Sequence, residues 1–249
     1  MPASADFTCV LVRGLFGSWI PGHFAAPLRR LRQAGLHALI ARSRANGTID
    51  ANASLLRADI DARVPAGRLL FLCHSKGGLD VLAMLSAAPE LRGRTAGLVL
   101  CQTPRAGCVV LESVLQDAHR DSAGGAQRAK EAAARAVIVL SGARDACLEL
   151  TSPRVQERVG SLAGLAAQLP LVSVASWSSQ PTTWLDSQHA RLGAIRPGCA
   201  HDGLFYLEDL VWPCGREIRL PQLDHAQMCV GDEGFDHGRF WLSLANLFK

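Results

Sequence analysis

The sequence lacks the features that mark several classes of protein. No apolar run is long enough to cross a bilayer, and neither an internal repeat nor a linker is visible. Only 19% of the 249 residues are charged whereas 49% are hydrophobic, which excludes a disordered chain. Arginine is spread along the chain without a basic tract, and the net charge is only +4, so we expect no nucleic-acid partner. These absences leave one well-buried globular domain.

The eight cysteines include no Cys-x-x-Cys pair. A chain of this length does not need a disulfide framework, and Cys9, Cys73 and Cys101 lie in apolar runs, where free cysteine behaves as a small hydrophobic residue. A bridge between Cys199 and Cys214 is the alternative left open. The first apolar run, "FTCVLV", is typical of a strand and not of a signal peptide. We therefore expect a cytoplasmic protein with reduced cysteines.

Short apolar runs rich in β-branched residues alternate with segments of helical period. The alternation predicts an α/β fold whose mostly parallel sheet has helices on both faces, since its strands are apolar throughout. The predicted strands are 7–14, 37–43, 68–74, 96–104, 169–177 and 217–225. The predicted helices include 48–64, with Thr48 or Asp50 as its cap, the all-apolar run 77–88, and a closing helix over 236–248.

Residues 108–168 depart from this alternation. The segment is rich in alanine and leucine, has a polar break at 121–127, and is too long for an ordinary connection. It predicts a helical cap inserted into a core made of 1–107 and 169–249. Within it, 135–142 has the composition of a strand, but the Ala/Lys/Glu run before it favours a continuing helix.

The stretch "CHSKGG" places Ser75 between an apolar strand and a buried helix. Cys73, Ser75 and Gly77 fit the small-x-Ser-x-small pattern of a nucleophile elbow, in which a strained turn exposes a serine hydroxyl. The helix start beside it offers free N–H groups to a developing negative charge. The pattern therefore predicts a nucleophilic serine at the carboxyl end of the sheet.

A nucleophilic serine needs a base and a carboxylate that orients the base. Among eight histidines, His225 follows the last predicted strand and so lies at the same end of the sheet as Ser75. Asp202, beside a glycine and before that strand, completes the order Ser, Asp, His. The other histidines remain alternatives to His225; Glu208, Asp209 and Asp145 remain alternatives to Asp202.

An oxyanion hole is predicted from two backbone N–H groups, those of Leu15 and Lys76. Leu15 follows Gly14, where the chain bends after the first strand, and Lys76 begins the helix after the serine. The positive charge of the Lys76 side chain, at a helix start, opposes the helix dipole. Two interpretations stay open: a solvated lysine at the mouth of the cleft, or a catalytic role. Phe16 and Trp19 lie near the same mouth, so we expect them to contact the substrate.

"VLVRGLFG", "HSKGG", "TPRAG", "LELTSPRV", "HDGL" and "LPQLDHAQM" occur in the order and spacing of bacterial triacylglycerol lipases and esterases. The sequence thus resembles this group of the α/β-hydrolase superfamily over nearly its whole length. The resemblance implies the α/β-hydrolase fold, Ser75 as nucleophile, Asp202 as acid, His225 as base and the N–H groups of Leu15 and Lys76 as oxyanion hole. Arg13 stands where the group usually has histidine, so the hydrogen bonding of this loop must differ.

We therefore expect a serine hydrolase that cleaves carboxylic esters of small molecules or lipids through an acyl-enzyme. Many members of the group bind calcium, but Ala226 and Gln227 follow the base here, so we expect no metal and no other cofactor. An acyltransferase or thioesterase and a depolymerase of intracellular polyester granules would use the same residues. A non-catalytic binding protein on a hydrolase scaffold is the alternative from another class. The sequence predicts nothing about the oligomeric state.

Overall fold

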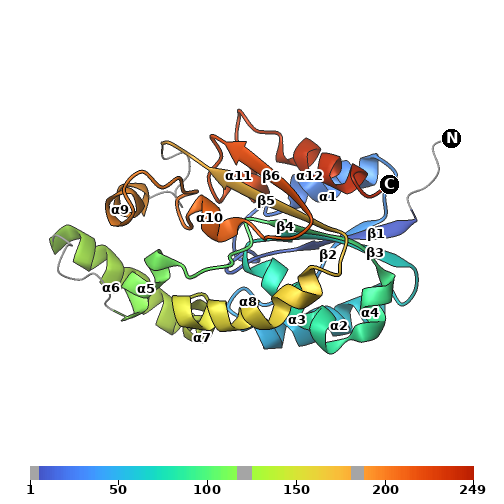
Figure 1. Ribbon diagram of the computed structural model, residues 1–249, viewed down its shortest axis with the longest axis horizontal. Coiled ribbons are helices and arrows are strands. Elements are labelled where there is room, and N and C mark those ends of the chain that lie inside the picture. The colour runs from blue at the N-terminus through green and yellow to red at the C-terminus, as the bar shows by residue number, and fades with distance from the viewer. Residues whose placement is uncertain (1–5, 117–124, 181–187) are drawn as a thin grey trace.

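Six strands form one all-parallel sheet in the order β2-β1-β3-β4-β5-β6. The computed structural model describes residues 6–116, 125–180 and 188–249 (Figure 1). The strands are β1 (Phe7–Val12), β2 (Ala38–Ile40), β3 (Arg68–His74), β4 (Thr95–Cys101), β5 (Leu171–Trp177) and β6 (Arg216–Pro221). All six predicted strands are therefore confirmed, with small differences at their ends.

Helices cover both faces of the sheet, as predicted. Figure 1 shows α2, α3, α4 and α8 on one face and α1, α11 and α12 on the other. The helices of these two layers are α1 (Ala25–Gln33), α2 (Ile49–Arg63), α3 (Lys76–Ala87), α4 (Pro89–Arg94), α8 (Ser152–Ala166), α11 (Gln227–Val230) and α12 (His237–Asn246).

Strand β3 shows why the central strands are apolar between their ends, here from Leu69 to Cys73. Successive side chains of a strand point to opposite faces of the sheet. Leu69 and Phe71 accordingly belong to the core beneath α2, α3 and α8, whereas Leu70 and Leu72 belong to the core beneath α1 and α12. A strand buried on both faces has no position for a polar side chain until it reaches His74, at its carboxyl end.

Local signals set the helices next to the site. Thr48 caps α2, because its hydroxyl accepts a hydrogen bond from the N–H of Ala51 at 3.3 Å. Of the two predicted caps, Thr48 is therefore the one that is confirmed. Helix α3 begins directly after Ser75 and is buried on every side from Lys76 to Leu85. Its burial against both the sheet and α2 fixes the turn that precedes it.

In its described part, the segment 108–168 consists of helices joined by short turns, with no strand. Its other helices are α5 (Val109–Gln116), α6 (Gly125–Leu140) and α7 (Arg144–Leu148), so the predicted helix over 135–142 is confirmed up to Leu140. Most of the predicted polar break, 121–124, lies outside the described residues. Helix α8 packs Val155, Val159 and Leu162 into the core beneath the sheet. The division into a core and a cap stays a prediction.

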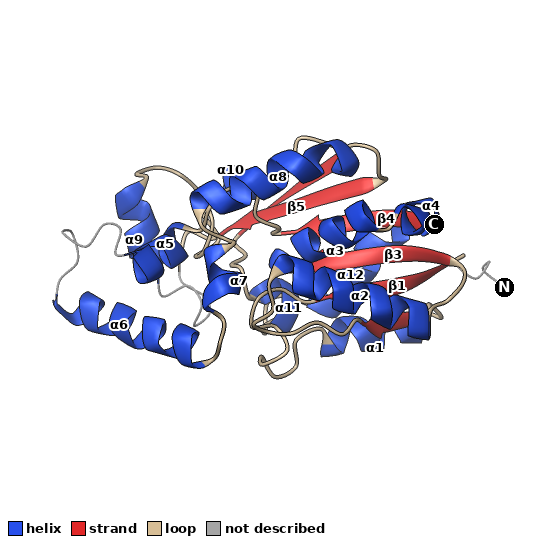
Figure 2. Ribbon diagram, turned by 90° about the horizontal axis from the view of Figure 1, so that it is seen from below, coloured by secondary structure: helices blue, strands red, loops and turns tan. Residues whose placement is uncertain are grey.

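Helices α5, α6 and α9 (His189–Ile195) lie beyond one end of the sheet, away from both termini (Figures 1 and 2). This is the carboxyl end of the strands, since α5 follows β4 and α9 follows β5. The last helix of the set is the short α10 (Leu207–Leu210), which lies against β5. The segments that follow the strands therefore surround the edge where ligands bind in open α/β sheets.

All eight cysteines are free thiols. The bridge left open between Cys199 and Cys214 is therefore wrong, and Cys9, Cys73 and Cys101 are buried core residues as predicted. Within the described part of the chain, no helix combines the length and the apolarity that a membrane span requires.

Candidate active site

Ser75 occupies a strained turn between β3 and α3. Its φ of 55° and ψ of −135° lie in a region that residues other than glycine rarely adopt. The N–H of Ser75 still donates to the carbonyl of Cys101 at 2.9 Å, so sheet pairing continues up to the serine, and α3 starts at the next residue. A strained conformation of this kind costs about 1–3 kcal/mol and persists only where packing enforces it.

Three glycines allow the chain to approach this turn. A Cβ on Gly77 would lie 2.6 Å from the carbonyl oxygen of Arg13, and one on Gly78 would lie 2.3 Å from the hydroxyl of Thr103. A Cβ on Gly14 would lie 2.8 Å from the Cβ of Ser75 and 3.3 Å from its Oγ. The loop after β1 therefore lies directly against the serine, as the predicted oxyanion loop requires.

Asp202 and His225 are hydrogen-bonded to each other, although they come from different loops. The Nδ1 of His225 lies 2.7 Å from Oδ2 of Asp202, and both side chains are buried. The other oxygen of Asp202 accepts from the N–H groups of Leu204 and Phe205 at 3.0 and 2.9 Å, which fixes the carboxylate. The N–H of His225 also donates to the carbonyl of Asp202 at 2.9 Å. Asp202 therefore orients the imidazole of His225 through Nδ1. The second ring nitrogen, Nε2, is not bonded to this carboxylate.

His74, the neighbour of Ser75, connects the serine turn to His225. Its Nε2 lies 3.0 Å from the carbonyl oxygen of His225, and the two rings are 4.8 Å apart between centroids. Burial, together with the nearby His225, lowers the pKa of His74 to about 3, and the imidazole is therefore neutral. The segment that carries His225 is thus bonded to the residue that precedes the serine.

The alternative carboxylates have other partners. Glu208 is exposed and pairs with Arg219 at 2.7 Å, and Asp209 pairs with Arg196 at 2.9 Å. Asp145 lies exposed on α7. None of the three has a hydrogen bond to His225 within the described residues, whereas Asp202 does.

The two predicted oxyanion donors flank the serine turn. Lys76 is the first residue of α3, where an N–H has no acceptor in its own helix. Leu15 follows Gly14, and the next two N–H groups have other acceptors: Phe16 donates to the carbonyl of Ala45, after β2, and Gly17 to that of Gly14. Arg13 donates to the carbonyl of His23 at 3.4 Å.

The Lys76 side chain is buried, which corrects the alternative of a solvated lysine at the cleft mouth. Only 1% of it is exposed, and its Nζ donates to Oδ1 of Asp80 at 2.6 Å. The other oxygen of Asp80 accepts from Asn52 on α2 at 2.9 Å. A lysine at a helix start is normally solvated, but Asp80, one helical turn later, supplies a buried partner for this ammonium group.

Apolar residues near the mouth come from two parts of the chain. Leu15 and Phe16 pack against a small cluster formed by Val114, Ile138 and Cys147 of the segment 108–168. Phe16 has a φ of 59° and stacks on Trp19 with 5.4 Å between ring centroids. Trp19 is 51% exposed, so this stack reaches from the cluster to the protein surface.

Two polar residues after β4 support the site and were missed by the sequence analysis. The Gln102 amide donates to the Ser176 hydroxyl at 2.7 Å and to the carbonyl of Asp224 at 3.1 Å, and its oxygen faces Nε2 of His74 at 3.0 Å. The hydroxyl of Thr103 donates to the carbonyl of Ser75 at 3.0 Å. The available signal was a polar pair directly after an apolar strand, at the edge where Ser75 lies.

No family model and no curated protein matches the sequence. In three dimensions the chain is similar to a metagenomic carboxyl esterase, with a TM-score of 0.77 and 19% identity over 99% of this chain and 76% of the other. It is also similar to the mature lipase of Bacillus licheniformis (TM-score 0.74, 15% identity, 100% and 94% covered) and to the lipase of Staphylococcus hyicus (0.61, 12%, 99% and 96%).

The chain therefore has the α/β-hydrolase fold, and its structural neighbours over the whole chain include bacterial esterases and lipases. This confirms the fold that the sequence resemblance implied.

Proposed function

We propose that the protein is a serine hydrolase of carboxylic esters, with Ser75 as nucleophile, His225 as base and Asp202 as the orienting acid. The strained backbone of Ser75 carries the proposal, because a serine held at positive φ between a strand and a buried helix has no structural advantage over glycine. The hydrogen bond between His225 and Asp202 supports it, since these residues are 23 positions apart and both are buried.

In the proposed reaction, Ser75 Oγ attacks the ester carbonyl carbon while Nε2 of His225 takes the hydroxyl proton. Asp202 holds Nδ1–H of the imidazole and stabilises its charged form. The carbonyl oxygen becomes negative in the tetrahedral intermediate and accepts hydrogen bonds from the N–H groups of Leu15 and Lys76. The intermediate collapses to an acyl-enzyme as the alcohol leaves with the proton from His225. Water, deprotonated by the same imidazole, then releases the acid.

The substrate class follows from the surroundings of Ser75. The cluster that joins Leu15 and Phe16 to the segment 108–168 offers apolar surface to an acyl chain, and the Phe16–Trp19 stack extends that surface to the mouth. We infer an ester with an apolar acyl group, from a small molecule or a lipid. A cytoplasmic location belongs to the same proposal, and the eight free thiols support a reducing compartment.

Hydrolysis of p-nitrophenyl esters of increasing chain length tests the proposal. We expect Ser75→Ala to lower kcat/KM by about 10⁴-fold or more, because the nucleophile is lost while binding remains. A fluorophosphonate probe should label the parent protein at Ser75 and leave the variant unlabelled. Ser86→Ala is the matched control, since Ser86 is exposed on the far end of α3. Equal rates for Ser75→Ala and the parent, or a parent that the probe does not label, would contradict the proposal.

A further inference from the structure

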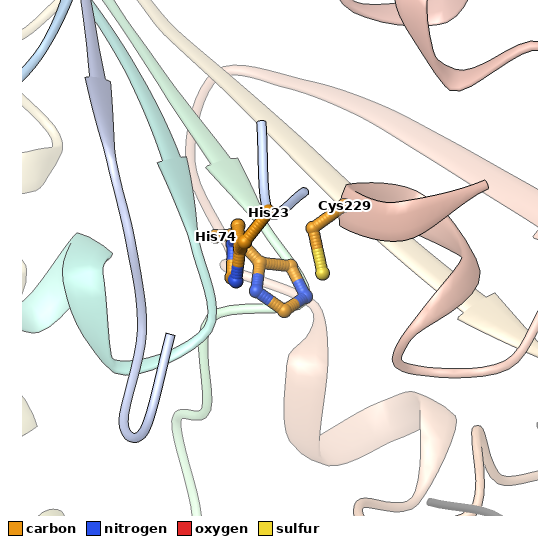
Figure 3. A group of neighbouring side chains, drawn as sticks. All are labelled: His23, His74 and Cys229. Atoms are coloured by element: carbon orange, nitrogen blue, oxygen red, sulfur yellow. The ribbon is translucent and has the colours of Figure 1, made fainter. Parts of the chain in front are cut away.

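A second group of chemically active side chains lies behind His74, and the proposed reaction does not use it. His23, His74 and Cys229 are buried, and each offers a nitrogen or sulfur atom within 4.8 Å of the atoms of the other two. Figure 3 shows the sulfur of Cys229 pointing toward the two imidazole rings. The residues come from the loop before α1, from the end of β3 and from α11, so the fold alone brings them together.

The two imidazoles leave nitrogen atoms without hydrogen-bond partners. Both ring nitrogens of His23 and Nδ1 of His74 are buried and have no partner among the described residues. Only 3% of His23 and 4% of His74 is exposed. A buried polar atom without a partner costs about 1–3 kcal/mol, so such atoms are rare in folded proteins. Three of them in one cluster indicate a site for a ligand.

The hydrogen bonds of His74 determine which nitrogen is available. Its Nε2 faces two acceptors, the carbonyl of His225 and Oε1 of Gln102, each at 3.0 Å. The amide nitrogen of Gln102 donates to Ser176 and Asp224, which fixes its oxygen toward His74. The proton of His74 therefore lies on Nε2, and Nδ1 presents a lone pair. Metal-binding histidines typically donate their other N–H to a carbonyl or carboxylate in this way.

The two imidazoles have the protonation state that a metal ion requires. Burial, together with the neighbouring His74, lowers the pKa of His23 to about 2, and burial is the main cause that lowers the pKa of His74 to about 3, so both imidazoles are neutral. Burial and the nearby carboxylate of Asp224 raise the pKa of the Cys229 thiol to about 12. The thiol is therefore protonated without a metal, and a bound metal would have to displace this proton to solvent to bind the thiolate.

Two negative charges lie at or near the cluster, and one positive charge opposes them. The thiolate contributes one negative charge, and Asp224, whose Oδ2 is buried without a partner, contributes a second. Arg13 acts in the opposite direction, because its charge also lowers the pKa of His23. Zinc prefers nitrogen and thiolate ligands at about 2.0–2.3 Å, which places bound ligand atoms about 3.3–3.6 Å apart. The three ligand atoms lie within 4.8 Å of one another, so the side chains would have to move closer together to bind one ion.

We propose that His23, His74 and Cys229 form a mononuclear zinc site. The ion joins three segments, the loop before α1, the end of β3 and α11, and through Nε2 of His74 it stabilises the backbone of His225. A fourth position remains for water, as in zinc sites with three protein ligands. The site does not depend on which reaction Ser75 performs.

The test measures zinc binding by the full chain, first stripped with a chelator. We expect about one equivalent of Zn²⁺ per chain, release of a proton, and a higher Tm with zinc than without it. Co²⁺ in place of zinc should give a thiolate-to-cobalt charge-transfer band. Cys229→Ala should abolish that band and raise the Kd for Zn²⁺ by at least about 100-fold, since loss of outer partners alone costs about 10–100-fold.

Two controls and a second variant make the result decisive. Cys199→Ala removes an exposed thiol and His37→Leu an exposed imidazole, and both should bind zinc as the parent does. His23→Leu should lose zinc affinity as Cys229→Ala does, which separates loss of a ligand from misfolding of one variant. Absence of stoichiometric binding, or equal binding by the parent and both ligand variants, would overturn the site. Ester hydrolysis and probe labelling at Ser75 are measured independently, so either proposal can fail without the other.

Discussion

Two buried polar clusters flank the serine turn, and they differ in whether their atoms are paired. The ion-pair cluster lies under α3 and consists of Lys76, Asp80 and Asn52, joined by hydrogen bonds of 2.6 and 2.9 Å. The imidazole–thiol cluster lies on the opposite side of β3, with the core beneath α1 and α12, and consists of His23, His74 and Cys229. The first contains two charges whose partners come from the chain itself, whereas the second contains three nitrogens that have none among the described residues.

The difference teaches how to interpret buried polar groups. The ion-pair cluster is explained by the fold, because it connects α2 to the start of α3, where the proposed oxyanion N–H of Lys76 lies. The imidazole–thiol cluster is not explained by the fold, because an apolar side chain in place of His23 would avoid two unpaired nitrogens, although the Cys229 thiol does donate to the carbonyl of Ala226 at 3.2 Å. The paired cluster therefore indicates support of the site, and the unpaired cluster indicates a missing ligand.

Removing the cation of the ion-pair cluster is expected to have the largest effect on stability. Burial raises the pKa of Asp80 to about 6, although Lys76 and Asn52 act to lower it. Lys76→Met leaves this buried carboxylate without its counter-charge, and we expect a loss of about 3–5 kcal/mol in the free energy of unfolding near pH 8. Chemical denaturation followed by circular dichroism measures this loss.

The same variant has an expected pH dependence. The pKa of Asp80 lies above its ordinary value of 3.8 in the folded protein, and losing Lys76 raises it further. The folded state therefore binds the proton more tightly than the unfolded state, and stability is lost as the pH rises through the folded pKa. The deficit of Lys76→Met should thus be smaller at pH 5 than at pH 8. Lys76→Met with Asp80→Asn removes both charges and serves as control; a single variant no less stable than this double variant at pH 8 would refute the explanation.

Asn52→Ala is expected to have an intermediate effect. The Asn52 amide donates to Asp80 and to the carbonyl of Arg44, and its oxygen accepts from the N–H of Arg44 at 2.9 Å. Its loss leaves buried groups unsatisfied, and we expect the free energy of unfolding to fall by about 1–3 kcal/mol. Ser54→Ala, on the exposed face of the same helix, is the comparison variant. If Asn52→Ala lost no more unfolding free energy than Ser54→Ala, the hydrogen bonds from α2 would not stabilise the ion-pair cluster.

His23→Leu is expected to have the smallest effect on the free energy of unfolding. The sign of that effect distinguishes the unpaired cluster from the paired one. In metal-free protein the variant removes two unpaired buried nitrogens, so we expect the free energy of unfolding to stay within about 1 kcal/mol of the parent or to rise. With zinc present, the parent should gain stability that the variant does not. Denaturation of both proteins with a chelator and with zinc measures the difference. A large loss in metal-free protein would show that the imidazole already has a partner, and the contrast between the clusters would disappear.

The sequence alone predicted the sheet and the elements that carry the site. The strands are apolar without interruption, so their period and length are visible without tertiary information, and β3 with α3 was placed correctly on both sides of Ser75. Gly77 and Gly78 marked the close approach that the structure confirms. Asp202 and His225 were singled out by their position between and after the last strands, and their hydrogen bond is present.

Other features depended on contacts between segments far apart in the sequence. The environment of Lys76 could not be predicted, because a lysine at a helix start is normally solvated and only the packing of α2 against α3 encloses it. Gln102 and Thr103 were included in the predicted strand 96–104 and given no role, since their partners Ser176, Asp224 and Ser75 are distant in the chain.

The sequence by itself thus determined the alternation of strands and helices, the serine turn and the candidate acid and base, because apolar periodicity and turn chemistry are local properties. Only the tertiary structure decided which buried polar atoms have partners. His23, His74 and Cys229 lie 51 and 155 residues apart along the chain, and no local pattern connects them. Their meeting depends on how β3, α1 and α11 pack, because a hydrogen-bond partner or a metal ligand is defined by distance in space and not by separation in sequence.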